Sequence, residues 1–165
     1  MNTTFKTLES LIHNSIEIHH QAAELYRSLE NESSDERCRI LLGEMAGKEL
    51  EMAKLLGEFL HRTPRGTLNT YMQYTLEEDP HDIVAAARSE GAGTVEQIGQ
   101  LGQKLHCYQI NLMEGALHEV AAEEACELLE NLLQLEKAEG RAFTRRADSI
   151  HDTNGFESKR TSFIM

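Results

Sequence analysis

The sequence has few residues that interrupt helices. Its 165 residues include only two prolines and no tryptophan, and runs of β-branched residues are short. Leu, Ala, Glu, Lys and Gln are frequent instead, and these residues favour helices. The length suits one domain with its own hydrophobic core. We therefore predict an all-α protein, with one domain over residues 1–150 and a polar, loosely docked or mobile tail over 151–165.

Positive charge and long apolar runs are also scarce. The net charge of −12 argues against nucleic-acid binding, because phosphates need a basic face. No apolar run is long enough to cross a bilayer, and the N-terminus has no apolar signal core. We expect a cytoplasmic protein with no nucleic-acid or membrane partner. Arg141, Arg145 and Arg146 cluster, but we assign them to the last turns of a helix, where cations complement the macrodipole.

Cysteine is too sparse to define a site. The three cysteines, Cys38, Cys107 and Cys126, are odd in number and far apart, which excludes both a disulfide framework and a Cys-x-x-Cys metal ribbon. We expect reduced, mostly packed thiols, and we assign no role to Cys107. Six histidines lie off the apolar stripes or in loops and are expected at the surface: His13, His20, His61, His81, His118 and His151.

Four apolar stripes of helical period predict four long helices. They cover residues 7–31, the segment from a capping box at Ser33 and Glu36 to about residue 63, the segment that begins at Thr94, and residues 122–149. Short hinges join the first two and the last two. The longer connection over 64–93 is expected to cross the bundle, with short helices near 68–74 and 83–88.

Several ionisable residues lie on these apolar stripes, where a carboxylate needs a partner, a proton or a metal. They also repeat. An offset of 87 positions relates His19 to His106 and Glu49 to Glu136, so the separation from histidine to glutamate is 30 in both halves. The same offset relates Met52 to Glu139. Two helical hairpins with this symmetry would bring the six residues into one region of the core.

Three segments carry a resemblance to a known family. Residues 15–26 are similar to the first helix of the rubrerythrin and ferritin-like di-iron carboxylate proteins, and residues 45–56 and 132–143 are similar to the Glu-x-x-His helices of that family. The resemblance covers about residues 5–150. It implies an antiparallel four-helix bundle with a long crossover between the second and third helices, and a metal site in its core.

The ligand pattern departs from that of the family. Glu49 and Glu136 match the bridging carboxylates, whereas His19 and His106 stand where the family has terminal acids. Met52 and Glu139 stand where it has paired histidines. The resemblance therefore implies an altered mono- or dinuclear site, with iron as the metal and manganese or zinc as alternatives. It also implies non-haem metal oxidoreductase activity, with no electron donor identified. Tyr26 and Tyr108 would lie next to the ligands.

One alternative to the metal site stays open, and one expectation concerns assembly. The buried acids and imidazoles could satisfy one another without a metal, in a four-helix bundle retained for assembly or partner binding. We also expect a homodimer, because the connection carries apolar and aromatic residues whose exposure to water is unfavourable, and a second copy of the chain would bury them. These residues are Leu68, Tyr71, Met72, Tyr74 and Leu76.

Overall fold

The computed structural model describes residues 3–77 and 79–163, without the side chains of Thr3, Leu76 and residues 151–163. Helices make up most of this part of the chain, which confirms the predicted mostly helical class. The elements, in chain order, are β1 (Thr3–Thr7), α1 (Leu8–Glu32), α2 (Glu36–Arg62), α3 (Arg65–Leu68), β2 (Tyr71–Leu76), α4 (Pro80–Glu90), α5 (Val95–Glu119) and α6 (Glu123–Phe163).

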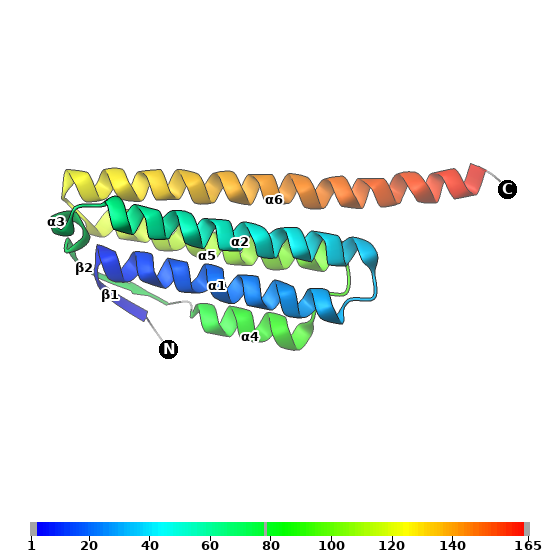
Figure 1. Cartoon of the computed structure of the whole chain (residues 1–165), viewed down its shortest axis with the longest axis horizontal. Coiled ribbons are helices and arrows are strands. Elements are labelled where there is room, and N and C mark those ends of the chain that lie inside the picture. The colour runs from blue at the N-terminus through cyan, green and yellow to red at the C-terminus, as the bar shows by residue number, and fades with distance from the viewer. Residues whose placement is uncertain (1–2, 78, 164–165) are drawn as a thin grey trace.

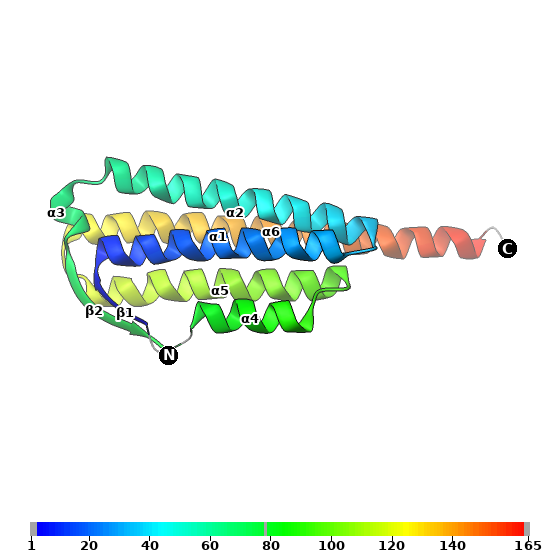
Figure 2. The ribbon, with the colours of Figure 1, turned by 60° about the horizontal axis from the view of Figure 1, so that its bottom comes forward.

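The four long helices lie side by side (Figures 1 and 2). α1 and α2 form one hairpin and α5 and α6 form the other, each joined by a short hinge. α4 packs against α1 and α5, while the small sheet and α3 lie at the end where α1 begins. Within the described residues, no helix has a stretch long and apolar enough to cross a membrane.

Side-chain caps set where the helices begin. Thr7 caps α1 and accepts a hydrogen bond from the Ser10 amide. Thr94 caps α5, as predicted. The cap of α2 is Asp35, whose carboxylate accepts from the amides of Arg37 and Cys38, so the predicted capping box at Ser33 is wrong. Asp and Ser are equally good caps, and the sequence alone did not distinguish them.

Two predicted segments differ from the structure. Residues 71–76 form strand β2 instead of continuing a short helix, because Tyr74 and its neighbours pair antiparallel with β1, where Phe5 lies opposite Tyr74. The strand partner is distant in sequence, so periodicity did not reveal it. The last helix ends at Phe163 instead of near Ser149, and Figure 1 shows α6 projecting past the other helices. The three arginines therefore lie within the helix, and the assignment to its last turns is wrong.

The connection buries most of its apolar residues within its own chain. Leu68 and Met72 are buried. The Tyr74 ring stacks on Phe5, and its hydroxyl donates to the Asn111 carbonyl. Only Tyr71 of the described side chains in the expected dimer surface is fully open, at 70% exposure, and the Leu76 side chain lies outside the description. Most of the reason for expecting a dimer is thereby removed.

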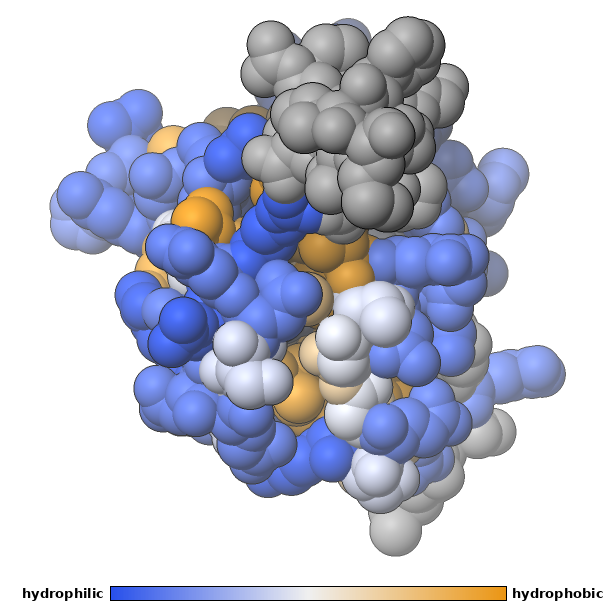
Figure 3. Space-filling view, turned by 90° about the vertical axis from the view of Figure 1, so that its right-hand side faces the viewer, coloured by the Kyte–Doolittle hydropathy of each residue, from blue (hydrophilic) through white to orange (hydrophobic). Residues whose placement is uncertain are grey.

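The hydrophobic core consists of two clusters that occupy the two ends of the long helices. The sheet-end cluster includes Leu8, Leu11, Ile18, Leu56, Met72, Tyr108, Leu112 and Leu133. The other cluster lies toward the hinge between α1 and α2, and we call it the hinge-end cluster; it includes Ala22, Leu25, Leu41, Met45, Ile98, Leu101 and Leu105. Figure 3, a view onto the hinge end, shows hydrophobic residues gathered between the helices inside a mostly hydrophilic face.

Polar residues lie at the boundary between these two clusters. His19 separates Ile18 from Ala22 along α1, and Glu136 follows Leu133 along α6. Glu49 and His106 lie at the corresponding level of α2 and α5. The clusters therefore do not merge into one apolar core, and the level between them is where a site would be built.

Candidate functional site

His19 is the centre of the polar level. Its side chain points from α1 into the core and is 1% exposed. Nδ1 lies 2.5 Å from Glu49 Oε2 on α2, and Nε2 lies 2.8 Å from Glu136 Oε1 on α6. Glu49 is 6% exposed and Glu136 is fully buried. One imidazole therefore bridges carboxylates from both halves of the chain.

With both carboxylates ionised, the two bonds require a doubly protonated ring. A neutral imidazole has one N–H donor, whereas two carboxylates on opposite nitrogens need two. Burial by itself lowers the pKa of His19, but hydrogen bonds and charge from Glu136 and Glu49 outweigh it and raise the pKa to about 10. At neutral pH the residue is thus an imidazolium. With both carboxylates ionised, the triad carries a net formal charge of −1 in the core.

Two buried oxygens beside the triad have no hydrogen-bond partner within the described residues: Glu136 Oε2 and the Tyr26 hydroxyl. Burial, reinforced by the charge of Glu49, raises the pKa of Tyr26 well above its ordinary value. Tyr26 therefore stays a neutral phenol. An unpaired buried carboxylate oxygen is costly, so the triad as it stands leaves part of its acceptor capacity unused.

A cavity of about 370 Å³ opens beside the triad, between α2, α5 and α6. Glu49 lies in its wall, so this carboxylate both holds His19 and faces the cavity. The other three predicted ligands, Met52, His106 and Glu139, line the same cavity. All six predicted site residues therefore lie either in the triad or on the cavity, and Glu49 belongs to both groups.

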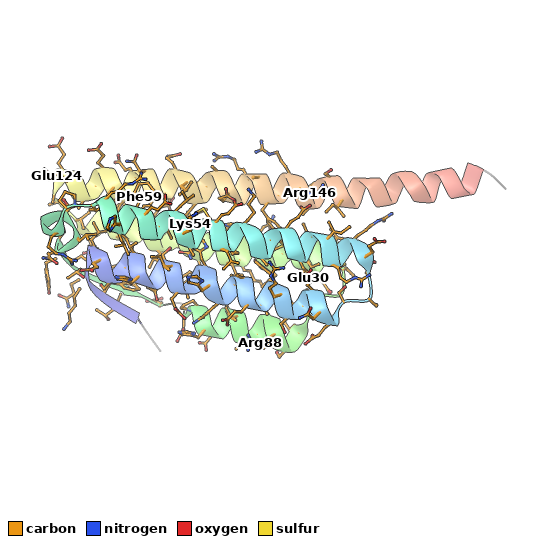
Figure 4. The ribbon with its side chains drawn as sticks, in the orientation of Figure 1. Glu30, Lys54, Phe59, Arg88, Glu124 and Arg146 are labelled. Atoms are coloured by element: carbon orange, nitrogen blue, oxygen red, sulfur yellow. The ribbon has the colours of Figure 1, made fainter. Side chains whose placement is uncertain are left out.

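Ion pairs flank the cavity. Arg146 on α6 donates two hydrogen bonds to Glu44 on α2, at 2.7 and 2.8 Å, and its place on α6 is marked in Figure 4. Lys48 donates to Glu51 at 3.1 Å. All four of these residues line the cavity. Arg146 was expected only to complement a helix end, and its real partner lies on another helix, which no sequence signal identified.

Small residues and one aromatic ring shape the cavity. A Cβ at Gly47 would have nothing within 4 Å, so α2 leaves open space there. A Cβ at Gly102 would instead clash with the Phe143 ring, which lies against α5 at this point. Gly43 also lines the cavity, but a Cβ there would lie 3.2 Å from a carboxylate oxygen of Glu30 on α1.

His106 does not repeat the contacts of His19. It is half-buried, its ring centroid lies 6.0 Å from that of Phe143, and no carboxylate in the described part of the chain is hydrogen-bonded to it. Within the described part of the chain, no group of three or more His, Cys, Asp or Glu side chains forms an arrangement that could hold a metal ion. Residues related by the sequence repeat therefore differ in geometry between the two halves of the chain.

Comparison with known proteins adds no relative. No family model matches this chain. No curated protein and no solved structure matches it either. A function for the chain must therefore be argued from its own residues.

Proposed function

We propose that this protein is a metal-binding protein of the ferritin-like kind, whose site combines the triad with the adjoining cavity. Glu49 and Glu136 would be the principal ligands, with His19, His106 and Glu139 as further nitrogen and oxygen donors. Met52 would close one side of the site. The observation that carries the proposal is the buried, unpaired Oε2 of Glu136 in a core triad of net negative charge.

Charge balance supports a cation. A divalent ion that replaced the additional proton of His19 would change the triad from −1 to neutral, which removes the cost of an uncompensated buried charge. The donor types also fit, since carboxylates and imidazoles suit iron, manganese and zinc. Such an ion, when bound, would supply Lewis acidity or, if it is iron or manganese, redox chemistry. The protein residues would position it and exclude water.

The arrangement of helices is consistent with this proposal. Two hairpins joined by a long connection through α3, β2 and α4 support the proposal, because a ferritin-like bundle with a crossover would have this order of elements. The family assignment rests on the sequence resemblance, so it belongs to the proposal. Replacement of the family's histidine positions by Met52 and Glu139 distinguishes this site from a standard di-iron centre.

Metal analysis tests the proposal. Untagged protein from cells grown with added iron, manganese and zinc should contain at least about half an equivalent of one metal, and that metal should raise the melting temperature of chelator-treated protein. Glu49→Gln and Glu136→Gln keep the side-chain shape but remove the charge, and each should abolish or halve the bound metal. Less than about a tenth of an equivalent, with no thermal shift, would refute metal binding.

Matched controls come from the exposed face of α1. Glu17→Gln removes a carboxylate charge, and His20→Ala removes an imidazole. Neither residue faces the core, so both variants should bind metal like the wild type. If they lose as much metal as the core variants, the binding is a general property of the acidic surface.

A metal-free polar core is the second candidate. It is favoured by one specific observation: His19 already donates to both carboxylates, so the triad is partly satisfied without an ion. The bundle would then serve assembly or partner binding. A protein that folds fully, binds no metal and melts at an unchanged temperature in a chelator would support this candidate.

The homodimer stays a prediction, supported mainly by the open Tyr71 on β2. Light scattering at micromolar concentration and moderate salt distinguishes the states. A monomer, unchanged in Tyr71→Ser, would end the expectation, because it would show that this side chain needs no cover.

A further inference from the structure

Three basic residues follow one another along one face of α6. Lys137, Arg141 and Arg145 are spaced by four positions, so they share that face. They lie well before the end of the helix at Phe163, so the macrodipole does not explain them. Neither Arg141 nor Arg145 has an ion pair with any residue that the structure describes, and Lys137 has only a partly exposed one, at 3.4 Å from Glu114.

These cations line a groove of about 510 Å³ between α5 and α6. His106 and Cys107 contribute to it from α5, and no carboxylate is among its lining residues. Such a lining is unusual for a chain of net charge −12. The remaining lining residues are Gln103 and Ile110 on α5 and Gly140 and Thr144 on α6, so Ile110 and Gly140 form its apolar part. The volume lies within the range of small-molecule sites.

We propose that this groove binds a small organic oxyanion, a carboxylate or phosphate ester with an apolar body. The guanidinium groups of Arg141 and Arg145 would donate charge-assisted hydrogen bonds to the oxyanion. The apolar body would lie along Ile110 and Gly140, away from water. His106 lines both this groove and the cavity beside Glu49, so the anion would be bound next to the proposed metal site without depending on a metal.

Binding in this groove would depend on its apolar space as well as on its positive charge. Gly140 lines the groove, and a Cβ there would make an ordinary contact of 3.7 Å with His106. The longer side chain of leucine would extend beyond that Cβ into the groove. Gly140→Leu therefore blocks the apolar part of the site while all three cations remain.

Calorimetric titration of the full, chelator-treated chain with octanoate, octyl phosphate and inorganic phosphate tests the site. At least one of the alkyl probes should bind about tenfold more tightly than inorganic phosphate, because only these probes use the apolar lining. Which headgroup binds better identifies the ligand as a carboxylate or a phosphate ester. Arg141→Glu/Arg145→Glu should weaken alkyl-probe binding by about tenfold or more. Gly140→Leu should weaken it similarly and leave inorganic phosphate unchanged.

The matched control changes the net charge equally at a distance. Arg39→Glu/Arg88→Glu alters two exposed arginines, of which Arg88 lies on α4, across the molecule from α6 (Figure 4). Circular dichroism first confirms that all variants fold, and the control should retain wild-type affinity. Equal losses in both double variants would show general charge attraction and overturn the proposal. So would no binding at millimolar probe, or inorganic phosphate binding as tightly as the alkyl probes, which would indicate an adventitious ion only.

Discussion

His19 and His106 occupy equivalent positions in the two halves of the chain, yet their surroundings differ. His19 is 1% exposed and donates to a carboxylate from each half. His106 is half-buried, lies beside Phe143 and faces a cavity on one side and a groove on the other. A repeated residue type at a repeated spacing therefore produced one ion-paired core residue and one cavity-lining residue.

The difference lies in which histidine the two core carboxylates contact. Glu49 and Glu136 both turn one oxygen toward His19, and within the described residues neither carboxylate is hydrogen-bonded to His106. His106 instead lies beside Phe143 at the edge of the core, where its ring is half-buried and borders the cavity and the groove. The half containing α1 and α2 therefore supplies the buried cation, and the half containing α5 and α6 supplies the accessible ring.

Removing each imidazole ring should give the largest difference in stability between the two histidine positions. His19→Leu leaves two buried carboxylates facing each other without a cation, so we expect a loss of about 3–5 kcal/mol in the free energy of unfolding. His106→Leu removes a partly exposed ring with no hydrogen bond and should change it by less than about 1 kcal/mol. Urea unfolding of chelator-treated protein measures both. Equal losses would show that the halves are energetically alike.

The pH dependence of stability should reveal which histidine is the buried cation. Below pH 6.5, the ordinary value, folded and unfolded chains both bind the proton, so its stabilisation is complete. Between pH 6.5 and about 10 the unfolded chain releases the proton while folded His19 keeps it. The free energy of unfolding should therefore fall by several kcal/mol as pH rises through this window. His106→Leu should retain the fall, and His19→Leu should lack it.

Alanine substitutions at Gly47 and Gly102 should change the stability of the protein in opposite directions. Gly102→Ala places a methyl group against the Phe143 ring and should destabilise the protein by about 1–3 kcal/mol. Gly47→Ala meets no atom and should stabilise α2 by about 0.5–1 kcal/mol, since alanine favours helices. Thermal melting of the two variants provides the measurement. A stabilised Gly102→Ala protein would show that Phe143 moves aside without cost.

The two buried tyrosines offer the smallest contrast. The Tyr26 hydroxyl has no hydrogen-bond partner among the residues that the structure describes, so Tyr26→Phe should leave stability unchanged or raise it by up to about 1 kcal/mol. The Tyr108 hydroxyl accepts a hydrogen bond from Asn14 at 3.1 Å. Tyr108→Phe should therefore cost about 0.5–1.5 kcal/mol. If Tyr26→Phe is the more destabilising change, its hydroxyl has a partner in solution, and a water or ion beside Glu49 would be the first to examine.

The positions of most long helices, and of the ionisable residues along them, could be predicted from the sequence. Helical period, the Thr94 cap and the shortage of proline are local properties, so they specify α1, α2 and α5 to within a few residues. The burial of Glu49 and Glu136 was likewise readable, because each lies on an apolar stripe. Local signals did not specify β2, whose pairing with β1 joins residues far apart in sequence.

The contacts between ionisable side chains follow from the tertiary structure and could not be read from the sequence. The 87-residue offset predicts equal roles for His19 and His106, but in the structure both carboxylates are hydrogen-bonded to His19. The structure likewise paired Arg146 with Glu44 and left Arg141 and Arg145 along a groove, although the three arginines look alike in sequence. The physical reason is that ion pairing in a core depends on ångström distances and on desolvation, and neither is a property of residue spacing along a single chain.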